Sequence, residues 1–284
     1  MSLLLLSCGQ AGLGQAGQPG SSIQIKGSDT MVNLGQAWAE EFMIENKSVG
    51  IAVTGGGSGT GIAAMINGTT DIAQSSRQMK QEEIESARKN GVEPQEFKVA
   101  LDGLAVVVNP ANPVNELTMD QLRDIFMGTV TNWSEVGGRE GRIVVLSRES
   151  NSGTHLYFKE HVLRRGNEKG PEEFAPRALL MPSSQAIADE VATNRNAIGY
   201  YGLGYVGNRQ KALAIAPKPG AKAVLPTVAT VVSGDYPISR PLFWYTRGKP
   251  EGTVRELVEF SLSDEGQQIV LDLDFVPLRK VGGS

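Results

Sequence analysis

A short apolar segment, a loop of small and hydroxyl-bearing residues, and an amphipathic helix follow one another repeatedly along this chain. Residues 23–26 alternate as a strand does, residues 27–30 form a turn with capping side chains, and an apolar face then recurs at helical spacing through Leu34, Trp38 and Phe42. Strands that alternate with helices form largely parallel sheets covered by helices, and ligands bind beside the carboxyl ends of such strands. We therefore expect an α/β protein whose binding site is built from loops.

The same order of elements continues to the end of the chain. Strands are expected at residues 51–53, 71–73, 104–109, 143–146 and 197–200, and helices at residues 62–66, 80–90, 119–126, 154–163, 253–263 and 264–271. Thr118 and Gln121 have the spacing of a capping box before one of these helices. A length of 284 residues suits two lobes. We place lobe 1 at residues 23–106 plus 229–284 and lobe 2 at residues 107–228.

Composition and charge exclude several classes of protein. Lys and Arg number 27 against 31 Asp and Glu, a net charge of −4, which argues against a nucleic-acid partner because phosphate-backbone binding needs an excess of positive charge. A single cysteine allows neither an internal disulfide nor a cysteine-cluster metal site. His155 and His161 are six residues apart, which does not align them on one helix face, and we expect His155 to lie at the surface. No metal and no cofactor is therefore expected.

Residues 1–22 do not have the pattern of a folded core. They contain four leucines, a cysteine at position 8, and a tract rich in glycine and glutamine. Leu5, Leu6, Ser7 and Cys8 resemble a bacterial lipobox, in which the cysteine is lipidated, so this segment is interpreted as a truncated lipoprotein signal followed by a flexible tether. The protein is then extracytoplasmic, in the periplasm or at the cell surface, and held to the membrane only by lipid. The alternative is a stray cysteine on a terminus.

Four loops between predicted strands and helices are rich in Ser, Thr, Gly and Arg: residues 28–31, 55–61, 75–77 and 148–154. The N-terminus of a helix carries unpaired N–H groups and partial positive charge, and hydroxyls and arginines add further donors. Together these groups suit a small tetrahedral oxyanion. The alternative is that the loops only cap helices, and that Arg77 and Arg148 pair with nearby carboxylates.

Motifs of nucleotide binding and of nucleophilic catalysis do not fit the glycine-rich loop. Residues 55–61 lack the glycine spacing of a dinucleotide fingerprint, and Ile62 stands where a P-loop requires lysine. Ser58 is not a nucleophile elbow, because Thr60 occupies the place of the second glycine. We therefore do not expect an enzyme. A phosphatase or phosphoryl-transfer protein is the alternative from that class.

These loops carry a resemblance to a known family. The turn at residues 27–30, the loop at 55–61, the segment 71–77 and the Ser-Gly-Thr sequence behind Arg148 resemble those of the substrate-binding protein of bacterial phosphate ABC importers, the PstS family. Residues 197–200, 265–267 and 275–278 extend the resemblance over residues 23–278. It implies a type II periplasmic-binding-protein-like fold with two lobes, each a mixed sheet flanked by helices, and a hinge of two strands.

The resemblance also implies a function and a set of site residues. The lobes would close on one inorganic phosphate and deliver it to a membrane permease, and the protein would act as a monomer. Thr30 and Met31 would bind phosphate by backbone N–H or hydroxyl, Ser58 would donate from the second loop, and the opposite lobe would close with its own donors. The full candidate set is Ser28, Asp29, Thr30, Met31, Ser58, Ser76, Arg77, Arg148, Ser152, Gly153 and Thr154.

One feature of the family does not carry over. Well-studied members have an aspartate near the position of Ser76, which accepts the proton of phosphate and rejects sulfate, and another acid where Ser150 stands here. Asp29 is the first candidate to replace the acceptor, and Glu149 is the second. A receptor for sulfate, molybdate or tungstate therefore stays an alternative, as does a sensor module of the same fold that does not transport.

Overall fold

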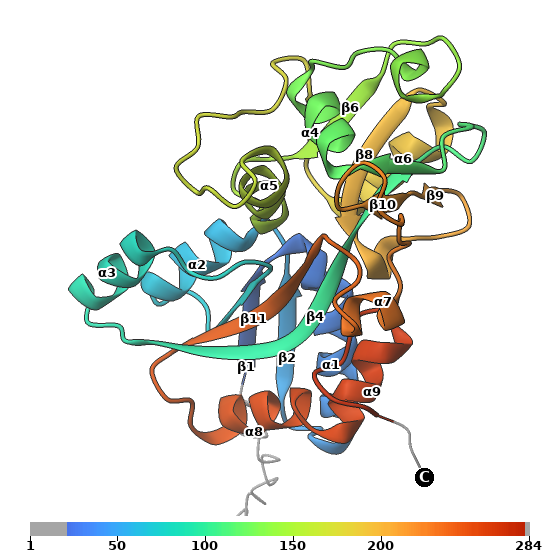
Figure 1. Cartoon of the computed structure of the whole chain (residues 1–284). Coiled ribbons are helices and arrows are strands. Elements are labelled where there is room, and N and C mark those ends of the chain that lie inside the picture. The colour runs from blue at the N-terminus through green and yellow to red at the C-terminus, as the bar shows by residue number, and fades with distance from the viewer. Residues whose placement is uncertain (1–21, 282–284) are drawn as a thin grey trace, which may run out of the picture.

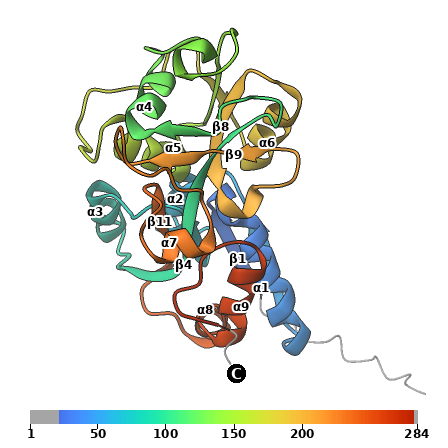
Figure 2. The same cartoon turned by 45° about the vertical axis from the view of Figure 1, so that its right-hand side comes forward.

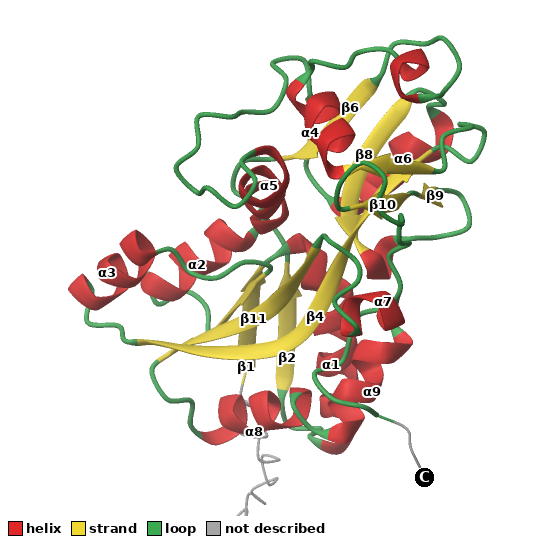
Figure 3. Cartoon of the chain, viewed as in Figure 1, coloured by secondary structure: helices red, strands yellow, loops and turns green. Residues whose placement is uncertain are grey.

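The computed structural model describes residues 22–281, which form two lobes connected by one continuous sheet (Figure 1; Figure 3). The order of strands in that sheet is β2-β1-β3-β11-β4-β8-β6-β7, with β9 paired to β4. A separate pair is formed by β10 and β5. The strands are β1 Ser22–Gly27, β2 Gly50–Thr54, β3 Ile72–Ser75, β4 Pro94–Val108, β5 Glu116–Thr118, β6 Val144–Arg148, β7 Leu179–Met181, β8 Ala197–Gly202, β9 Lys211–Ala212, β10 Ala214–Ala216 and β11 Ser239–Arg247.

The α-helices lie mainly on the faces of this sheet. They are α1 Val32–Glu45, α2 Ser58–Ile66, α3 Gln81–Lys89, α4 Met119–Met127, α5 Gly153–Phe158, α6 Ser184–Thr193, α7 Val228–Val232, α8 Gly252–Ser261 and α9 Asp264–Asp272. Short 3-10 helices span η1 Asp29–Met31, η2 Trp133–Val136 and η4 Leu203–Tyr205, and the π-helical turn η3 Lys159–Leu163 continues α5. The α/β class with helices around mixed sheets is confirmed.

The sheet of the first lobe is covered on both faces. Trp244 of β11 packs with Trp38 of α1 and with α8 and α9, whereas its neighbours Phe243 and Tyr245 pack on the other face with α2 and α3. Successive strand residues point to opposite faces, so one buried strand supplies apolar side chains to both layers. The rings of Trp38 and Trp244 meet edge-on, with centroids 4.9 Å apart.

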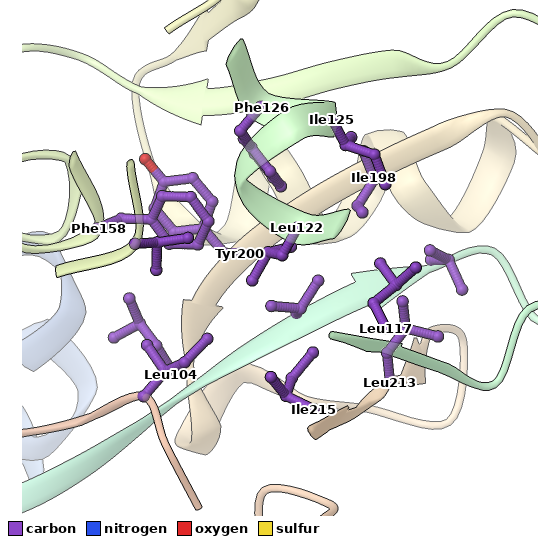
Figure 4. Close-up of a cluster of buried hydrophobic side chains, with 14 of the residues drawn as sticks. Leu104, Leu117, Leu122, Ile125, Phe126, Phe158, Ile198, Tyr200, Leu213 and Ile215 are labelled. Carbon is purple, nitrogen blue, oxygen red and sulfur yellow. The ribbon is translucent and has the colours of Figure 1, made fainter. Parts of the chain in front are cut away.

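The second lobe has its own core, which includes an aromatic group (Figure 4). Phe158 stacks on Tyr200 with ring centroids 3.8 Å apart, and Phe126 of α4 packs against both rings. Leu122 and Ile125 extend the apolar face of α4 onto the sheet. The predicted capping box of this helix is confirmed, because Gln121 N donates to Thr118 Oγ1 over 3.1 Å and Thr118 N donates to the Gln121 side chain.

One long strand joins the lobes. β4 pairs with β11 as far as Gly103 and with β8 from Leu104 onward, and Figure 2 shows it running upward from one lobe into the other. The chain crosses back beside it, where Leu104 N donates to Ile238 O over 2.8 Å just before β11 begins. The two-strand hinge is therefore present. The residue boundaries given above for the two lobes stay a prediction.

Some elements were not foreseen from the sequence. β11, α6 and the first half of β4 were not predicted from the sequence. The strands and helices that were predicted are found within a few residues of their expected places. Cys8 and its tether lie outside the described residues. Within residues 22–281, none of the helices has the length and apolar character needed to cross a membrane.

Candidate anion-binding site

Loops from both lobes meet at one place beside the hinge. β1, β2 and β3 are parallel, so their carboxyl ends lie at the same edge of the sheet, and the loops that follow them carry Thr30, Ser58 and Ser76. β6 of the second lobe ends at Arg148 and leads to Ser152, which caps α5. The predicted loops are thus brought together by the strand order, although they come from distant parts of the chain.

Buried hydroxyl groups form the centre of this site. Thr30 Oγ1 and Thr154 Oγ1 lie 2.8 Å apart and join the two lobes. Ser58 Oγ accepts the N–H of Ser76 over 3.0 Å and lies 3.3 Å from Ser76 Oγ. Gly153 packs directly against the two serines, and a methyl group added to it would overlap Ser58 Oγ. The site therefore presents a dense set of polar groups that can donate hydrogen bonds and carry no charge of their own.

The glycine-rich loop also contacts the second lobe. Gly59 N donates to Asn151 O over 3.1 Å, and Asn151 Nδ2 donates to Gly56 O over 2.8 Å. Gly57 has a φ of 96° and so occupies a conformation that favours glycine, and a methyl group there would lie 2.7 Å from Asn151 O. Glycine at this position allows the backbones of the two lobes to approach closely.

The backbone N–H groups of Met31 and Thr154 already have partners. Met31 N donates to Ser28 O over 3.1 Å, and the Met31 side chain is buried in the core of the first lobe. Thr154 N donates to Ser152 Oγ over 3.2 Å. The groups of Thr30 and Thr154 that meet across the lobes are their side-chain hydroxyls.

Arg148 is almost completely buried, and its guanidinium binds several groups. Nε donates to Met181 O, Nη2 to Pro182 O over 3.0 Å, and Nη1 to Ser184 Oγ over 3.1 Å. Nη1 also lies 3.2 Å from Asp29 Oδ2 in the opposite lobe. Burial lowers the pKa of Arg148, although the Asp29 carboxylate opposes this effect. Arg148 therefore holds the loop before α6 and links the lobes through an ion pair.

Arg77 lies at the edge of the site with its charge neutralised. Its two terminal nitrogens donate to the two carboxylate oxygens of Glu83 over 2.8 and 2.7 Å, and Nη1 also donates to Gln78 O. Burial by itself would raise the pKa of Glu83. The hydrogen bond and the positive charge of Arg77 outweigh this effect, so the pKa of Glu83 is lowered. This geometry supports the alternative that Arg77 pairs with a carboxylate.

Sequence reasoning missed another arginine, Arg240 of β11. Its side chain is buried, and Nη2 donates to Asp102 Oδ2 and to Thr154 Oγ1, each over 2.9 Å. Thr30 Oγ1 is 3.5 Å from the same nitrogen. Asp102 lies opposite Arg240 in the sheet, on the neighbouring strand β4, and is also buried. Burial raises the pKa of the Asp102 carboxyl, although the charge of Arg240 opposes this shift. No motif links these two residues, which are 138 positions apart.

Comparison with known proteins places the chain in a family. A model of the PBP superfamily domain matches residues 14–265. The phosphate-binding protein PstS of Pseudomonas aeruginosa is 34% identical over 269 residues, which cover 89% of this chain and 81% of that protein. The chain belongs to the PstS family. PstS of Bacillus subtilis is 31% identical over 290 residues, 97% of this chain and 90% of that protein.

Solved structures of PstS-like proteins have the same fold. A phosphate ABC transporter substrate-binding protein of Clostridium perfringens, solved with bound phosphate, superposes with a TM-score of 0.80 at 32% identity. The match covers 91% of this chain and all of that one. An ABC-type phosphate transport receptor of Vibrio cholerae gives a TM-score of 0.70 at 29% identity, over 90% of this chain and all of that one.

Two carboxylates near the site, Asp29 and Glu149, are the candidates for the acceptor of the phosphate proton. Asp29 Oδ2 accepts the N–H of Ser184 over 2.8 Å in addition to its contact with Arg148. Glu149, the second candidate for the proton acceptor, is exposed, and so is Ser150. Among residues 22–281, no cluster of His, Cys, Asp and Glu side chains is arranged to hold a metal ion.

The prediction that His155 lies at the surface is wrong. The side chain is buried, its ring packs against Phe174 with centroids 4.6 Å apart, and Nδ1 lies 3.2 Å from Ser147 Oγ. Ser147 Oγ in turn is 2.7 Å from the hydroxyl of Tyr200. Position 155 faces the lobe because α5 packs its first turn onto the sheet, which the helix pattern alone did not indicate.

Burial of His155 predicts a loss of stability in mild acid. Burial lowers the pKa of His155 from 6.5 to about 4, so between these values the unfolded chain binds a proton that the folded chain does not. Stability therefore falls as the pH falls below 6.5, by roughly 2 kcal/mol at pH 5. Urea unfolding at pH 7.5 and pH 5 measures the change. In His155→Gln, the loss of stability between pH 7.5 and pH 5 should be smaller. An equal loss in both proteins would show that His155 does not cause it.

Proposed function

We propose that this protein binds inorganic phosphate between its lobes. The observation that carries the proposal is the convergence of buried hydroxyls from both lobes, Thr30 and Ser58 on one side and Thr154 on the other, at the ends of parallel strands. Membership of the PstS family and the similarity to a structure solved with bound phosphate support phosphate as the anion. Ser28, Asp29, Ser76, Arg148, Ser152 and Gly153 also belong to the proposed site.

The charges of the proposed site are balanced before the anion arrives. Arg148 pairs with Asp29, and Arg240 pairs with Asp102, so each buried guanidinium has a carboxylate beside it. Phosphate would then be held by fixed dipoles and hydrogen bonds, which act strongly in a site that excludes water. Such a site does not require a basic protein, in agreement with the net charge of −4.

We further propose the cellular role of a substrate-binding protein. The chain would capture phosphate outside the cytoplasm, in the periplasm or at the cell surface, and pass it to the permease of an ABC importer without changing it chemically. Cys8, if lipidated, would anchor the protein, which would act as a monomer. Similarity to phosphate transport receptors supports this role, whereas the anchor rests on the sequence near Cys8 alone.

Binding of phosphate is tested by calorimetry and thermal unfolding with a panel of oxyanions. Several charge-assisted hydrogen bonds at about 1.5–3 kcal/mol each, less the costs of desolvation and closure, lead us to expect a micromolar or tighter complex. Phosphate at 100 times its dissociation constant should add about 2.7 kcal/mol to the stability, which raises Tm by roughly 5 °C. Sulfate should bind much more weakly. Equal binding of sulfate and phosphate, or no effect of phosphate, would contradict the proposal.

The discrimination between phosphate and sulfate is assigned to Asp29 as the proton acceptor. A carboxylate in contact with a bound anion is tolerated only when a shared proton forms a hydrogen bond, and sulfate has no such proton at neutral pH. Measured with the same oxyanions, Asp29→Asn should therefore lower the ratio of phosphate affinity to sulfate affinity. Glu149→Gln removes the same charge at an exposed position and is the matched control, which should keep the preference of the unmodified protein.

A further inference from the structure

Arg240 lies in the hinge, between the two lobes and beside the proposed anion site. We propose that Arg240 is itself a phosphate ligand and donates hydrogen bonds to the anion from Nη1. This inference rests on the proposed function and adds to the site a residue from the hinge strand β11, in addition to the loops of the two lobes. Arg240 also lines a cleft between α3 and α5, together with Arg77 and Tyr157.

The hydrogen bonds of Arg240 leave one nitrogen without an acceptor. A guanidinium has five N–H groups. Nε and Nη2 both donate to Asp102 Oδ2, and Nη2 also donates to Thr154 Oγ1. Nη1 is buried and has no hydrogen-bond partner within residues 22–281. A buried donor on a charged group is costly when it is unpaired, so an acceptor is expected at Nη1 in the functional state.

The position of the guanidinium places this free donor at the site. Nη1 and Nη2 are held at a fixed, short separation by the planar guanidinium, and Nη2 already contacts the hydroxyl of Thr154 and lies 3.5 Å from that of Thr30. An oxyanion that accepts hydrogen bonds from these two hydroxyls is therefore within reach of Nη1. Asp102 orients the group, because its other carboxylate oxygen is fixed by the N–H of Leu203 over 3.1 Å.

The other two arginines of the site have fewer free donors. Each nitrogen of Arg148 has an acceptor, and its Nη1 contacts both Ser184 and Asp29. Both terminal nitrogens of Arg77 donate to Glu83. Arg240 thus combines complete burial, contact with threonines of both lobes, and a terminal nitrogen whose hydrogens have no acceptor. An anion at Nη1 would connect the hinge with both lobes in the closed state.

The test compares phosphate affinity in a double variant and a matched control. Asp102→Asn combined with Arg240→Met removes the ion pair without leaving a buried unpaired charge, which would itself disturb folding. Calorimetry should show phosphate affinity reduced about 10- to 100-fold, as expected for the loss of one strong charge-assisted hydrogen bond. Asp189→Asn combined with Arg209→Met also removes an ion pair without changing the net charge, but at an exposed position, and its affinity should stay within about threefold of the unmodified protein.

A second measurement separates a ligand from a purely structural residue. In protein labelled with ¹⁵N-arginine, phosphate should shift and slow the exchange of the Nη1–H signals of Arg240, whereas the signals of Arg77 should stay unchanged. If the double variant does not fold, Arg240→Lys is the further variant, because it keeps the positive charge next to Asp102. Arg240→Lys should also bind phosphate more weakly than the unmodified protein. Phosphate binding at full affinity in these variants, or an unchanged Arg240 signal, overturns the inference. Absence of binding in the unmodified protein instead overturns the proposed function.

Discussion

Replacement of Gly153 by alanine is expected to weaken phosphate binding by at least about 100-fold, because the new methyl group would occupy the contact between the lobes. It would overlap Ser58 Oγ and lie 2.7 Å from Ser76 Oγ and 3.0 Å from Ser58 Cβ. Ser58 Oγ cannot turn away freely, since it accepts the N–H of Ser76. Either the serine leaves the site or the lobes fail to close, and both outcomes remove hydrogen bonds to the anion.

The free protein should fold normally with this substitution. The clash lies between the lobes, which can separate at the hinge, and alanine favours a helical first turn more than glycine does. Gly59→Ala is the matched control, because a methyl group there meets its nearest atom, Asn151 O, at 3.4 Å. We expect calorimetry to show near-normal affinity for Gly59→Ala and strongly reduced affinity for Gly153→Ala, with similar Tm values without phosphate. Comparable affinities would show that the lobes do not close on Gly153.

The loops of the site could be foreseen from the sequence because their position follows from local patterns. Period-two strands, capping residues and helical faces identify β1, β2, β3 and β6, and parallel strands carry their following loops to one edge. The hydroxyls of Thr30, Ser58 and Thr154 therefore lie together, as predicted from the strand-to-helix order. What the pattern could not indicate was which donors remain free, since that depends on partners from distant segments.

Arg240 shows why part of the site was missed. β11 is buried on both faces, so it has a continuous apolar run in place of alternation, and Pro241 beside the arginine is unusual within a sheet. The first half of β4 was missed for a related reason, because its exposed, polar end does not alternate clearly. The pairing of Arg240 with Asp102 exists only because these two strands meet, and no local signal in either segment reveals it.

The partners of Arg148 also change what its sequence position suggested. From its loop alone, Arg148 is predicted to be a phosphate ligand, with a pair to a nearby carboxylate as the alternative. In the structure it donates to Met181 O and Pro182 O and to the hydroxyl of Ser184, all within the second lobe. These bonds fix the turn that begins α6. The arginine therefore supports the fold as well as the anion site.

Arg148→Ala should accordingly abolish phosphate binding and also lower the stability of the free protein. The substitution leaves the carbonyls of Met181 and Pro182 and the buried hydroxyl of Ser184 without their donor, and it leaves the Asp29 carboxylate without its cation. Loss of such a buried group costs about 2–4 kcal/mol, and phosphate affinity should fall more than about 100-fold. Urea unfolding without phosphate and calorimetry with phosphate measure the two effects separately.

Arg209→Ala is the matched control for this prediction, because it removes the same charge from the second lobe at an exposed position. Arg209 pairs with Asp189, and both side chains are more than half exposed to solvent, so the pair contributes at most about 1 kcal/mol. This variant should unfold and bind phosphate almost as the unmodified protein does. If Arg148→Ala lost phosphate but unfolded at the same urea concentration as Arg209→Ala, the bonds of Arg148 within its own lobe would not stabilise the fold, and its role would be limited to the anion.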